Sequence, residues 1–262
     1  MKMRVHSWHE WEVITITSGC WEMIIGISAG PRILSLRLNG GENLLYIDNT
    51  GFKVGDWILY GGHRFTTAPE NDESYYPDNE PCEMIIEDFE VVIKAAVRPN
   101  KSRLSIKIIE SSTVHGFDII HELENVGDQD WSGALWAITC LPRHALVTAN
   151  CNSSVINYWP RTDSSNWQIV DQKMQVKAGS YRGKAGWHEK NAWFAATQSS
   201  GDLMICNPEI GEPDDCVDGG CNTEIFVCHD YFELETLSKR ITVPPGKSAR
   251  HVQHWRLFDN FS

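Results

Sequence analysis

The chain has 262 residues, of which 42% are hydrophobic and 22% are charged. These values are ordinary for a soluble globular protein and exclude an intrinsically disordered chain. The formal net charge of −12 argues against a surface for nucleic acids or anionic membranes, because no basic run supplies the contacts that such binding needs.

No segment has the features of a membrane span or a secretion signal. The sequence contains no apolar stretch long enough to cross a bilayer. Arg4, His6, His9 and Glu10 interrupt residues 1–11, whereas a signal peptide needs an apolar run after a basic region. We therefore expect a cytoplasmic protein that binds neither membranes nor nucleic acids. The sequence does not indicate an oligomeric state.

Apolar and polar residues alternate with a period of two along most of the chain. In residues 103–108, Leu104, Ile106 and Ile108 share one face, and polar side chains occupy the other. This pattern is typical of a half-buried β-strand. Similar patterns predict strands at 12–17, 22–27, 32–38, 91–97, 117–124, 135–141, 193–197, 203–207, 223–229, 232–237 and 251–258.

Turn-forming residues separate these segments, as in 39–41, 99–100, 125–128 and 199–202. Asn, Asp, Gly and Ser at such positions favour tight connections between antiparallel strands. No segment keeps helical periodicity over three turns, and no linker or repeat divides the chain. The pattern predicts an all-β protein of stacked antiparallel sheets, formed as one domain over residues 1–262.

Residues 57–83 interrupt the strand pattern with a polar segment. It begins with Gly61-Gly62-His63-Arg64, continues through Ala68-Pro69-Glu70 and ends near Tyr75-Tyr76-Pro77-Asp78-Asn79. Two glycines permit positive φ or close backbone approach, while Arg64 and His63 offer donors and a titratable group. We interpret the segment as an irregular loop that holds a polar ligand. An ordinary surface loop, with Arg64 paired to Glu70 or Asp78, remains open.

Residues 150–173 form a second irregular segment and contain Trp159 and Trp167. Long irregular loops in compact domains are often functional. The chain has 11 tryptophans, whose flat rings can stack on the apolar face of a sugar or simply fill the core. Trp159 and Trp167 are the better ligand candidates because they lie in loop sequence.

Eight cysteines do not establish disulfides in a chain without a recognisable secretion signal. Cys216, Cys221 and Cys228 lie close together in the sequence and precede His229. They lack the CxxC pair that structural zinc sites usually contain. We expect reduced thiols and no metal site.

Several motifs along the chain resemble an uncharacterised bacterial family within the galactose-mutarotase-like, or aldose 1-epimerase-like, superfamily. The resemblance begins with the Gly-Gly-x-Arg, Pro-Glu and Pro-Asp sequence of residues 61–78. The other matching segments are 33–36 with 43–45, 121–125, 131 with 136–139, 186–187, 233–237, 243–247 and 255–257. The resemblance implies a β-supersandwich whose concave face binds a small-molecule sugar or sugar derivative.

The resemblance also implies interconversion of the α and β anomers of an aldose. This chemistry needs a base for the anomeric hydroxyl and an acid for the ring oxygen, with the roles reversed on reclosure. No cofactor is required. In the resembling enzymes the base is a Glu near the carboxyl end, which matches Glu235, with Glu233 and Glu224 as alternates. Glu233 and Glu235 lie two residues apart and should share one strand face.

Histidines supply the acid in the resembling enzymes. His144 follows the strand of Trp136 and is our first candidate, with His63 as the second. We expect Arg64, Asp78, Glu70 and Glu233 to orient the sugar. We expect Trp159 to form an apolar platform for it.

Two other functions remain compatible with the same architecture. A binding module would keep the cleft and lack the chemistry. A polysaccharide lyase would use a phenol such as Tyr75, Tyr76 or Tyr158 to abstract a proton next to a uronate carboxylate. A fold hosts many chemistries, so the fold alone does not choose among them.

Overall fold

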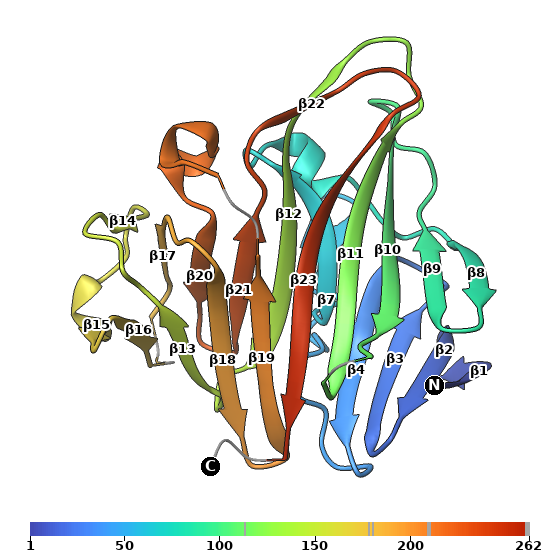
Figure 1. The fold of residues 1–262 in the computed structure, drawn as a ribbon, viewed down its shortest axis with the longest axis horizontal. Coiled ribbons are helices and arrows are strands. Elements are labelled where there is room, and N and C mark those ends of the chain that lie inside the picture. The colour runs from blue at the N-terminus through green and yellow to red at the C-terminus, as the bar shows by residue number, and fades with distance from the viewer. Residues whose placement is uncertain (113, 178, 180, 209–210, 260–262) are drawn as a thin grey trace.

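A computed structural model describes residues 1–112, 114–177, 179, 181–208 and 211–259. Two large antiparallel sheets face each other in it (Figure 1). Helical structure within these residues is limited to four short 3-10 turns: η1 (Asp72–Tyr75), η2 (Ser164–Asn166), η3 (Pro213–Asp215) and η4 (Asp218–Gly220). The predicted all-β class with stacked antiparallel sheets is confirmed.

The first sheet contains eleven strands within the described residues. Ten follow one another in the order β1 (Lys2–Trp8), β2 (Trp11–Ser18), β3 (Trp21–Gly26), β4 (Arg32–Leu38), β7 (His63–Ala68), β12 (Trp131–Pro142), β21 (Tyr231–Leu237), β20 (Thr223–Val227), β17 (Gly183–Trp187) and β14 (Asn157–Tyr158). The eleventh, β22 (Ile241–Val243), pairs with the start of β12. Strands from both halves of the chain therefore meet at β7, β12 and β21.

Ten strands of the described chain form the second sheet. Their order is β15 (Trp167–Val170), β16 (Lys173–Val176), β13 (Leu146–Asn150), β18 (Ala192–Gln198), β19 (Gly201–Asn207), β23 (Ser248–Phe258), β11 (Gly116–Asn125), β10 (Ser102–Glu110), β9 (Glu90–Lys94) and β8 (Glu83–Glu87). A separate hairpin joins β5 (Lys53–Val54) to β6 (Trp57–Ile58).

The hydrophobic core lies between the two sheets, and strand alternation fills it. In β11, Phe117, Ile119 and Leu123 are buried, while every second residue from Asp118 onward is only partly buried. Trp255 on β23 and Phe232 on β21 are fully buried from opposite sheets. Alternation directs one set of side chains into the core and leaves the other set for the outer faces.

The segment 57–83 differs from the expected irregular loop. Residues His63–Ala68 form β7, which is buried along its whole length between β4 and β12. The two glycines fit close backbone packing. A Cβ on Gly61 would lie 2.3 Å from the carbonyl oxygen of Tyr46, and one on Gly62 would lie 2.2 Å from that of Ile33. The sequence predicts a loop here because most residues of this strand are polar. They are buried nonetheless, because their side chains have partners inside the protein.

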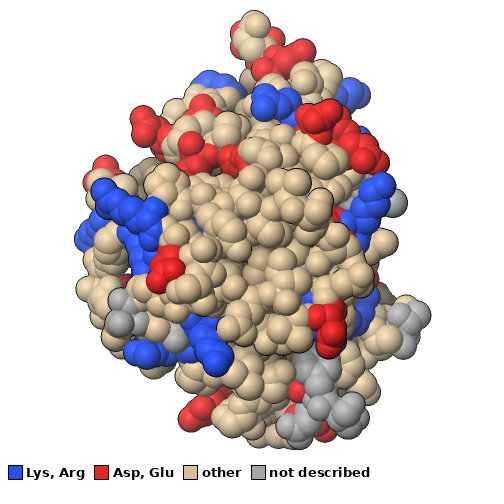
Figure 2. Space-filling model, turned by 90° about the vertical axis from the view of Figure 1, so that its left-hand side faces the viewer, with Lys and Arg blue, Asp and Glu red and all other residues tan. Residues whose placement is uncertain are grey.

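No helix in the described part of the chain is long and apolar enough to cross a membrane. Figure 2 shows the side of the molecule that carries β14, β15 and β16. The centre of this side is uncharged, and its Lys and Arg residues form separate groups interrupted by acids. This side therefore presents no continuous basic surface of the kind that nucleic acids bind.

Candidate functional site

One cross-strand row on the outer face of the first sheet gathers charged residues. The register aligns Arg64 of β7 with Ile138 of β12, then Glu235 of β21, Glu224 of β20 and Gly186 of β17. Directly opposite residues of antiparallel strands point to the same face. A charged row thus crosses five neighbouring strands.

A second row lies two residues along the same strands and shares this face. It aligns Cys140 of β12 with Glu233 of β21, Phe226 of β20 and Lys184 of β17. Residues two apart in a strand point the same way, so Glu233 and Glu235 face one side of the sheet. The two rows place three carboxylates and two cations together.

These rows form the floor of a cleft with a volume of about 730 Å³. Its charged lining residues are Arg64, Arg161, Arg182, Lys184, Glu70, Glu233 and Glu235. Its aromatic lining residues are Phe52, Trp57, Tyr75, Trp136, Trp159, Phe226 and Tyr231. Apolar walls with a few convergent polar groups are typical of small-molecule sites.

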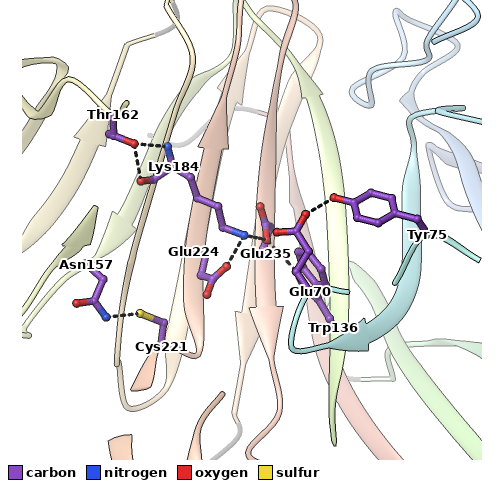
Figure 3. Close-up of polar contacts among 9 residues, drawn as sticks. All are labelled: Glu70, Tyr75, Trp136, Asn157, Thr162, Lys184, Cys221, Glu224 and Glu235. Carbon is purple, nitrogen blue, oxygen red and sulfur yellow. Dashed lines mark hydrogen bonds and ion pairs between the residues drawn. The ribbon is translucent and has the colours of Figure 1, made fainter. Parts of the chain in front are cut away.

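Lys184 is the centre of the polar contacts in the cleft (Figure 3). Its Nζ lies 2.6 Å from Oε2 of Glu224 and 2.8 Å from Oε2 of Glu235. The indole N–H of Trp136 donates to the same oxygen of Glu235 at 2.8 Å. Burial opposes the charge of Lys184, but Glu235 and Glu224 outweigh it and raise the pKa of the ammonium. Lys184 therefore stays charged and holds Glu235 in place.

Aromatic rings enclose the same ammonium. Nζ of Lys184 lies 4.8 Å from the ring centre of Trp136 and 5.0 Å from that of Trp159. Such contacts favour a cation over the face of a ring. The Trp159 ring thus lines the cleft beside the Lys184–Glu235 pair.

Glu224 lies beneath the cleft floor and is fully buried. Burial raises its pKa to about 8, Lys184 opposes this shift, and Glu235 adds to it. Gly186 leaves the space that this side chain occupies, since a Cβ there would lie 2.9 Å from Cγ of Glu224 and 3.1 Å from Cζ3 of Trp159. Glu224 therefore carries a proton through much of the neutral pH range.

Glu233 is partly exposed to the cleft. Burial and the nearby charge of Glu235 raise its pKa to about 7, while Arg64 and Lys184 oppose the shift. The pKa lies close to neutrality, so both forms of Glu233 are populated at physiological pH. Glu235, in contrast, is fixed in an ion pair. Two carboxylates with such different surroundings are suited to different roles in proton transfer.

Arg64 lies at the β7 end of the cleft floor. Its guanidinium lies 4.8 Å from the ring centre of Trp57 and 5.9 Å from that of Tyr75. The Tyr75 hydroxyl donates to Oε1 of Glu70. Figure 3 shows Glu70 between Tyr75 and Glu235. The aromatic stack limits the movement of Arg64, and Glu70 adds an acceptor to the site.

The structure brings most of the expected site residues to this cleft. Five of them line it: Glu235, Glu233, Arg64, Glu70 and Trp159. They come from separate parts of the sequence, and only the sheet register assembles them.

His63 does not reach the cleft, contrary to the expectation of a catalytic role. Neighbouring strand residues point to opposite faces, so His63 enters the inter-sheet core while Arg64 faces the cleft. His63 is fully buried. Its Nε2 lies 2.7 Å from Nε2 of His121, and its Nδ1 lies 2.9 Å from the Thr139 hydroxyl. Burial, with Arg32 and His251, lowers its pKa to about 3.

The hydrogen bonds of this core network fix the tautomers. Nδ1 of His121 must donate to the backbone carbonyl of His251 at 3.0 Å, so Nε2 of the neutral His121 ring accepts. His63 then donates from Nε2 and accepts from Thr139 at Nδ1. Both rings are neutral, and both nitrogens of each have partners. The network is structural.

His144 also lies outside the cleft, so the expected acid is misplaced. It is exposed in the turn after β12. Pro142 pairs with Tyr231, four residues along from the pairing of Ile138 with Glu235. At about 3.4 Å per residue, this pairing lies about 14 Å along the strand from Glu235. His144 follows after a further turn.

Asp78 has a different partner from the expected sugar hydroxyls. Its Oδ2 accepts from Nη2 of Arg32 at 2.5 Å, and Arg32 also donates from Nη1 to the carbonyl of Gly61 at 3.2 Å. Neither residue of the pair lines the cleft. Asp78 therefore anchors the loop after η1 to β4.

Sequence reasoning missed Lys184, the residue with the most contacts to the carboxylates. One signal was available: Lys184 is the only charged residue in Gly183-Lys184-Ala185-Gly186-Trp187, where small residues leave space around it. Period-two patterning does not detect so short a strand. Trp136 was noted only as part of a motif, although its N–H binds Glu235.

The described residues contain no group of three or more His, Cys, Asp or Glu side chains that could hold a metal ion. Cys221 is buried and contacts the Asn157 amide at 3.2 Å. Burial raises the pKa of the Cys221 thiol to about 12, with Glu224 adding to the shift. This thiol is therefore protonated at neutral pH.

No protein-family model matches the sequence, and no curated protein matches it either. Solved structures do match the fold. A galactose mutarotase-like protein from Lactobacillus casei ATCC 334 has a TM-score of 0.64 at 9% identity, over 94% of this chain and 99% of that chain. A proposed aldose 1-epimerase from Escherichia coli K12 has a TM-score of 0.63 at 13% identity, over 94% and 98%.

A TPR-domain containing protein from Parabacteroides distasonis ATCC 8503 matches with a TM-score of 0.63 at 13% identity. The match covers 96% of this chain and 48% of that protein, so the chain spans about half of its length. Identities this low establish the fold alone. The resemblance drawn from the sequence motifs is confirmed at that level, and the chain has the fold of the galactose mutarotase-like superfamily.

Proposed function

We propose that the cleft binds a sugar or sugar derivative and interconverts its anomers by acid–base catalysis. One observation carries the proposal: two carboxyl groups with different surroundings, Glu233 with a raised pKa and Glu235 paired with Lys184, face one cleft from β21. The fold of mutarotase-like proteins is a supporting analogy.

In this proposal Glu235 is the base. Its carboxylate, paired with Lys184, removes the proton from the anomeric hydroxyl as the bond between C1 and the ring oxygen breaks. Glu233 gives its proton to the ring oxygen. Rotation about the C1–C2 bond then exposes the other face of the aldehyde. On reclosure the ring hydroxyl returns its proton to Glu233, and Glu235 returns its own to O1.

The acid role passes to Glu233 because the expected histidines lie elsewhere. A pKa of about 7 leaves a large protonated fraction at neutral pH, which is the condition for a general acid there. Its partial exposure to the cleft gives it access to a ligand.

The cleft walls supply groups for sugar recognition. Trp159 offers a flat apolar ring, and Arg64 and Glu70 offer donors and acceptors for hydroxyls. At about 30 Å³ for each water-sized group, 730 Å³ holds about two dozen non-hydrogen atoms. A monosaccharide fits with room to spare, so a larger sugar derivative is equally compatible.

Exchange spectroscopy on a panel of aldoses would test the proposal. We expect wild-type protein to accelerate anomer exchange of at least one sugar, and Glu235→Gln to reduce that rate by about 10²–10⁴-fold. Glu122→Gln serves as the matched control, since Glu122 is partly exposed and pairs with Arg250 on the other sheet. If the wild-type protein leaves the exchange rate of every sugar at its uncatalysed value, the proposed catalytic activity is rejected.

A sugar-binding module is the second candidate, and the burial of Glu235 favours it. Glu235 is 1% exposed, and its Oε2 already accepts from both Lys184 and Trp136. In this case a sugar would raise the melting temperature of both the wild type and a Glu233→Gln/Glu235→Gln double variant. Neither protein would accelerate anomer exchange.

A lyase has less support. Burial and the hydrogen bond to Glu70 raise the pKa of Tyr75, which opposes the phenolate that a lyase base needs. Burial also raises the pKa of Tyr158, which does not line the cleft.

A further inference from the structure

Two exposed arginines, Arg161 and Arg182, line the end of the cleft that β14 and β17 form. Arg182 directly precedes β17 and lies two residues from Lys184, so both side chains point to the cleft face. The backbone N–H of Trp159, which follows β14, donates to the carbonyl of Lys184 at 3.0 Å. Continuing this antiparallel pairing by two residues brings Arg161 opposite Arg182. Two guanidinium groups therefore lie at the same end of the cleft.

The turn from Trp159 to Thr162 holds Arg161 in this position. It closes with a hydrogen bond from the N–H of Thr162 to the carbonyl of Trp159 at 3.1 Å. The Thr162 hydroxyl donates to the carbonyl of Lys184 at 3.0 Å and accepts from the N–H of the same residue at 2.9 Å (Figure 3). Backbone and side-chain hydrogen bonds thus fasten the turn to β17.

The backbone of Arg161 has a φ of 72°. Arg161 is the third residue of the turn, after Pro160, and a positive φ at this position normally goes with Gly or Asn. A residue with a Cβ costs stability there relative to glycine. The guanidinium is held at the cleft in spite of this strain, which is consistent with a role in binding.

Aromatic rings support Arg182. Its guanidinium carbon lies 5.1 Å from the ring centre of Phe226. Phe226 lies 6.0 Å from Tyr231 between ring centres, and Tyr231 stacks on Tyr46 at 4.8 Å. Contact with a ring uses the flat face of a guanidinium, so the N–H donors in its plane remain available to a ligand.

Neither arginine has a carboxylate partner within the described residues. Lys184, in contrast, pairs with both Glu224 and Glu235. The charged lining residues of the cleft are four cations and three carboxylates, an excess of one positive charge in a chain of net charge −12. Protonation of Glu233 raises this excess to two. An anionic group on a ligand would therefore find two unpaired guanidinium groups here.

We propose that the ligand of the cleft is a hexuronate, a sugar whose carboxylate lies on the carbon remote from the anomeric centre. Arg161 and Arg182 bind the carboxylate, and the anomeric end lies at Glu233 and Glu235. This inference rests on the proposed function, because it takes the acid–base pair as the reacting end of the cleft.

The sheet geometry leaves space for one pyranose ring between the two ends. Lys184 is aligned with Phe226 and Glu233, so β17 lies two strands away from β21. Two strand spacings of about 4.8 Å and one step of two residues, about 6.8 Å, put the Cα atoms of Arg182 and Glu233 about 12 Å apart. Both side chains cover part of this span, and a six-membered ring with its carboxylate fills the rest.

A carboxylate suits this end of the cleft better than a phosphate. Phosphate sites commonly use backbone N–H groups at a helix N-terminus, and the described residues contain no α-helix. The planar fork of a guanidinium matches a planar carboxylate through two parallel hydrogen bonds. An excess of one to two positive charges in a protein of net charge −12 favours a monoanion over a phosphate dianion.

Calorimetry at pH 7 would test the ligand class with D-glucuronate and D-galacturonate, each compared with its neutral hexose and with the hexose 6-phosphate. We expect at least about tenfold tighter binding of one hexuronate than of the matching hexose, because hydrogen bonds between charged groups are the strong ones. Equal affinities, or no saturable binding of either hexuronate, would overturn the proposal. Tighter binding of the 6-phosphate would overturn the choice of a carboxylate.

Two variants would locate the bound carboxylate. Arg182→Met should weaken hexuronate binding at least about tenfold and leave the binding of the neutral hexose unchanged. Arg161→Gly should weaken it similarly and also raise the melting temperature, since glycine adopts a positive φ without strain. Lys101→Gly is the matched control, because Lys101 has a φ of 61°, is exposed and does not line the cleft.

The control should show the gain in melting temperature with unchanged hexuronate binding. Unchanged hexuronate binding in either arginine variant would overturn the proposal. Binding and anomer exchange are measured separately, so the two proposals fail in different ways. Arginine-dependent hexuronate binding without accelerated exchange would reject the catalytic function and keep the ligand class. Accelerated exchange of a neutral hexose, with hexuronate binding that ignores both arginines, would do the reverse.

Discussion

The two faces of β7, β12 and β21 both bury polar side chains, but in different ways: the cleft face buries an ion pair, and the core face buries neutral rings. On the cleft face, the charged Lys184 ammonium pairs with Glu235 at 2.8 Å. On the core face, burial lowers the pKa of both His63 and His121, and the two neutral rings bond to each other at 2.7 Å. Burial penalises charge on both faces, and only a close counter-charge reverses the outcome.

The two faces therefore differ in role: the cleft face carries groups suited to acid–base chemistry, and the core face carries groups that stabilise the fold. The cleft face keeps groups that titrate near neutrality or remain ionised, such as Glu233 and Lys184. The core face keeps neutral groups with fixed hydrogen bonds. Adjacent residues can therefore differ completely in role, as His63 and Arg64 do.

The largest effect should come from removing the Lys184 ammonium, which neutralises the buried carboxylates on the cleft face. Lys184→Met leaves Glu224 and Glu235 facing each other without a cation, and we expect a loss of about 3–5 kcal/mol in the free energy of unfolding at pH 7. Urea denaturation would measure it. The loss should grow as pH rises through 8, where Glu224 ionises beside Lys184 in the wild type but has no cation in the variant.

The matched control is Lys190→Met. Lys190 pairs with Glu212 at 3.2 Å, but both side chains are more than half exposed. We expect less than about 1 kcal/mol from this exposed pair. A comparable loss in both variants would contradict the importance of burial.

The two faces should also respond oppositely to pH. The pKa of Glu233 is raised to about 7 in the fold, so its contribution to stability is present below about pH 4.5 and is lost as pH rises through 7. The pKa of His63 is lowered to about 3, so its contribution is present above about pH 6.5 and is lost as pH falls toward 3. Each fully shifted group contributes a slope of up to about 1.4 kcal/mol per pH unit.

Stability curves of two variants would separate these slopes. Glu233→Gln should flatten the decline between about pH 5 and 7, and His63→Phe should flatten the decline between about pH 6 and 4, each relative to wild type. Urea midpoints across this range supply the measurement. Parallel curves for wild type and both variants would contradict the assignment of the slopes.

The smallest effect should come from His144→Ala. His144 is exposed in a turn outside both faces, and we expect a change within about 0.5 kcal/mol in stability and no change in any anomer exchange rate. A tenfold loss of exchange would restore His144 as the acid and weaken the role proposed for Glu233.

Many of the strands could be predicted from the sequence pattern. The patterns at 32–38, 103–108, 117–124 and 232–237 correspond to β4, β10, β11 and β21. Strands with few apolar residues could not be predicted in this way. The two that matter for the site are β7, which carries Arg64, and β17, which carries Lys184. Both lie beside well-patterned strands that supply their hydrogen bonds, so their own side chains need not alternate.

The sequence by itself determined the all-β class and which residue types could bind a ligand, because alternation and turn chemistry are local properties. It also placed Glu233 and Glu235 on one strand face, since that requires only the period of a strand. Only the tertiary structure decided that Arg64 joins them while His63 does not, and that Lys184 pairs with Glu235. Those outcomes depend on which strands are neighbours and on their register, which no local pattern specifies.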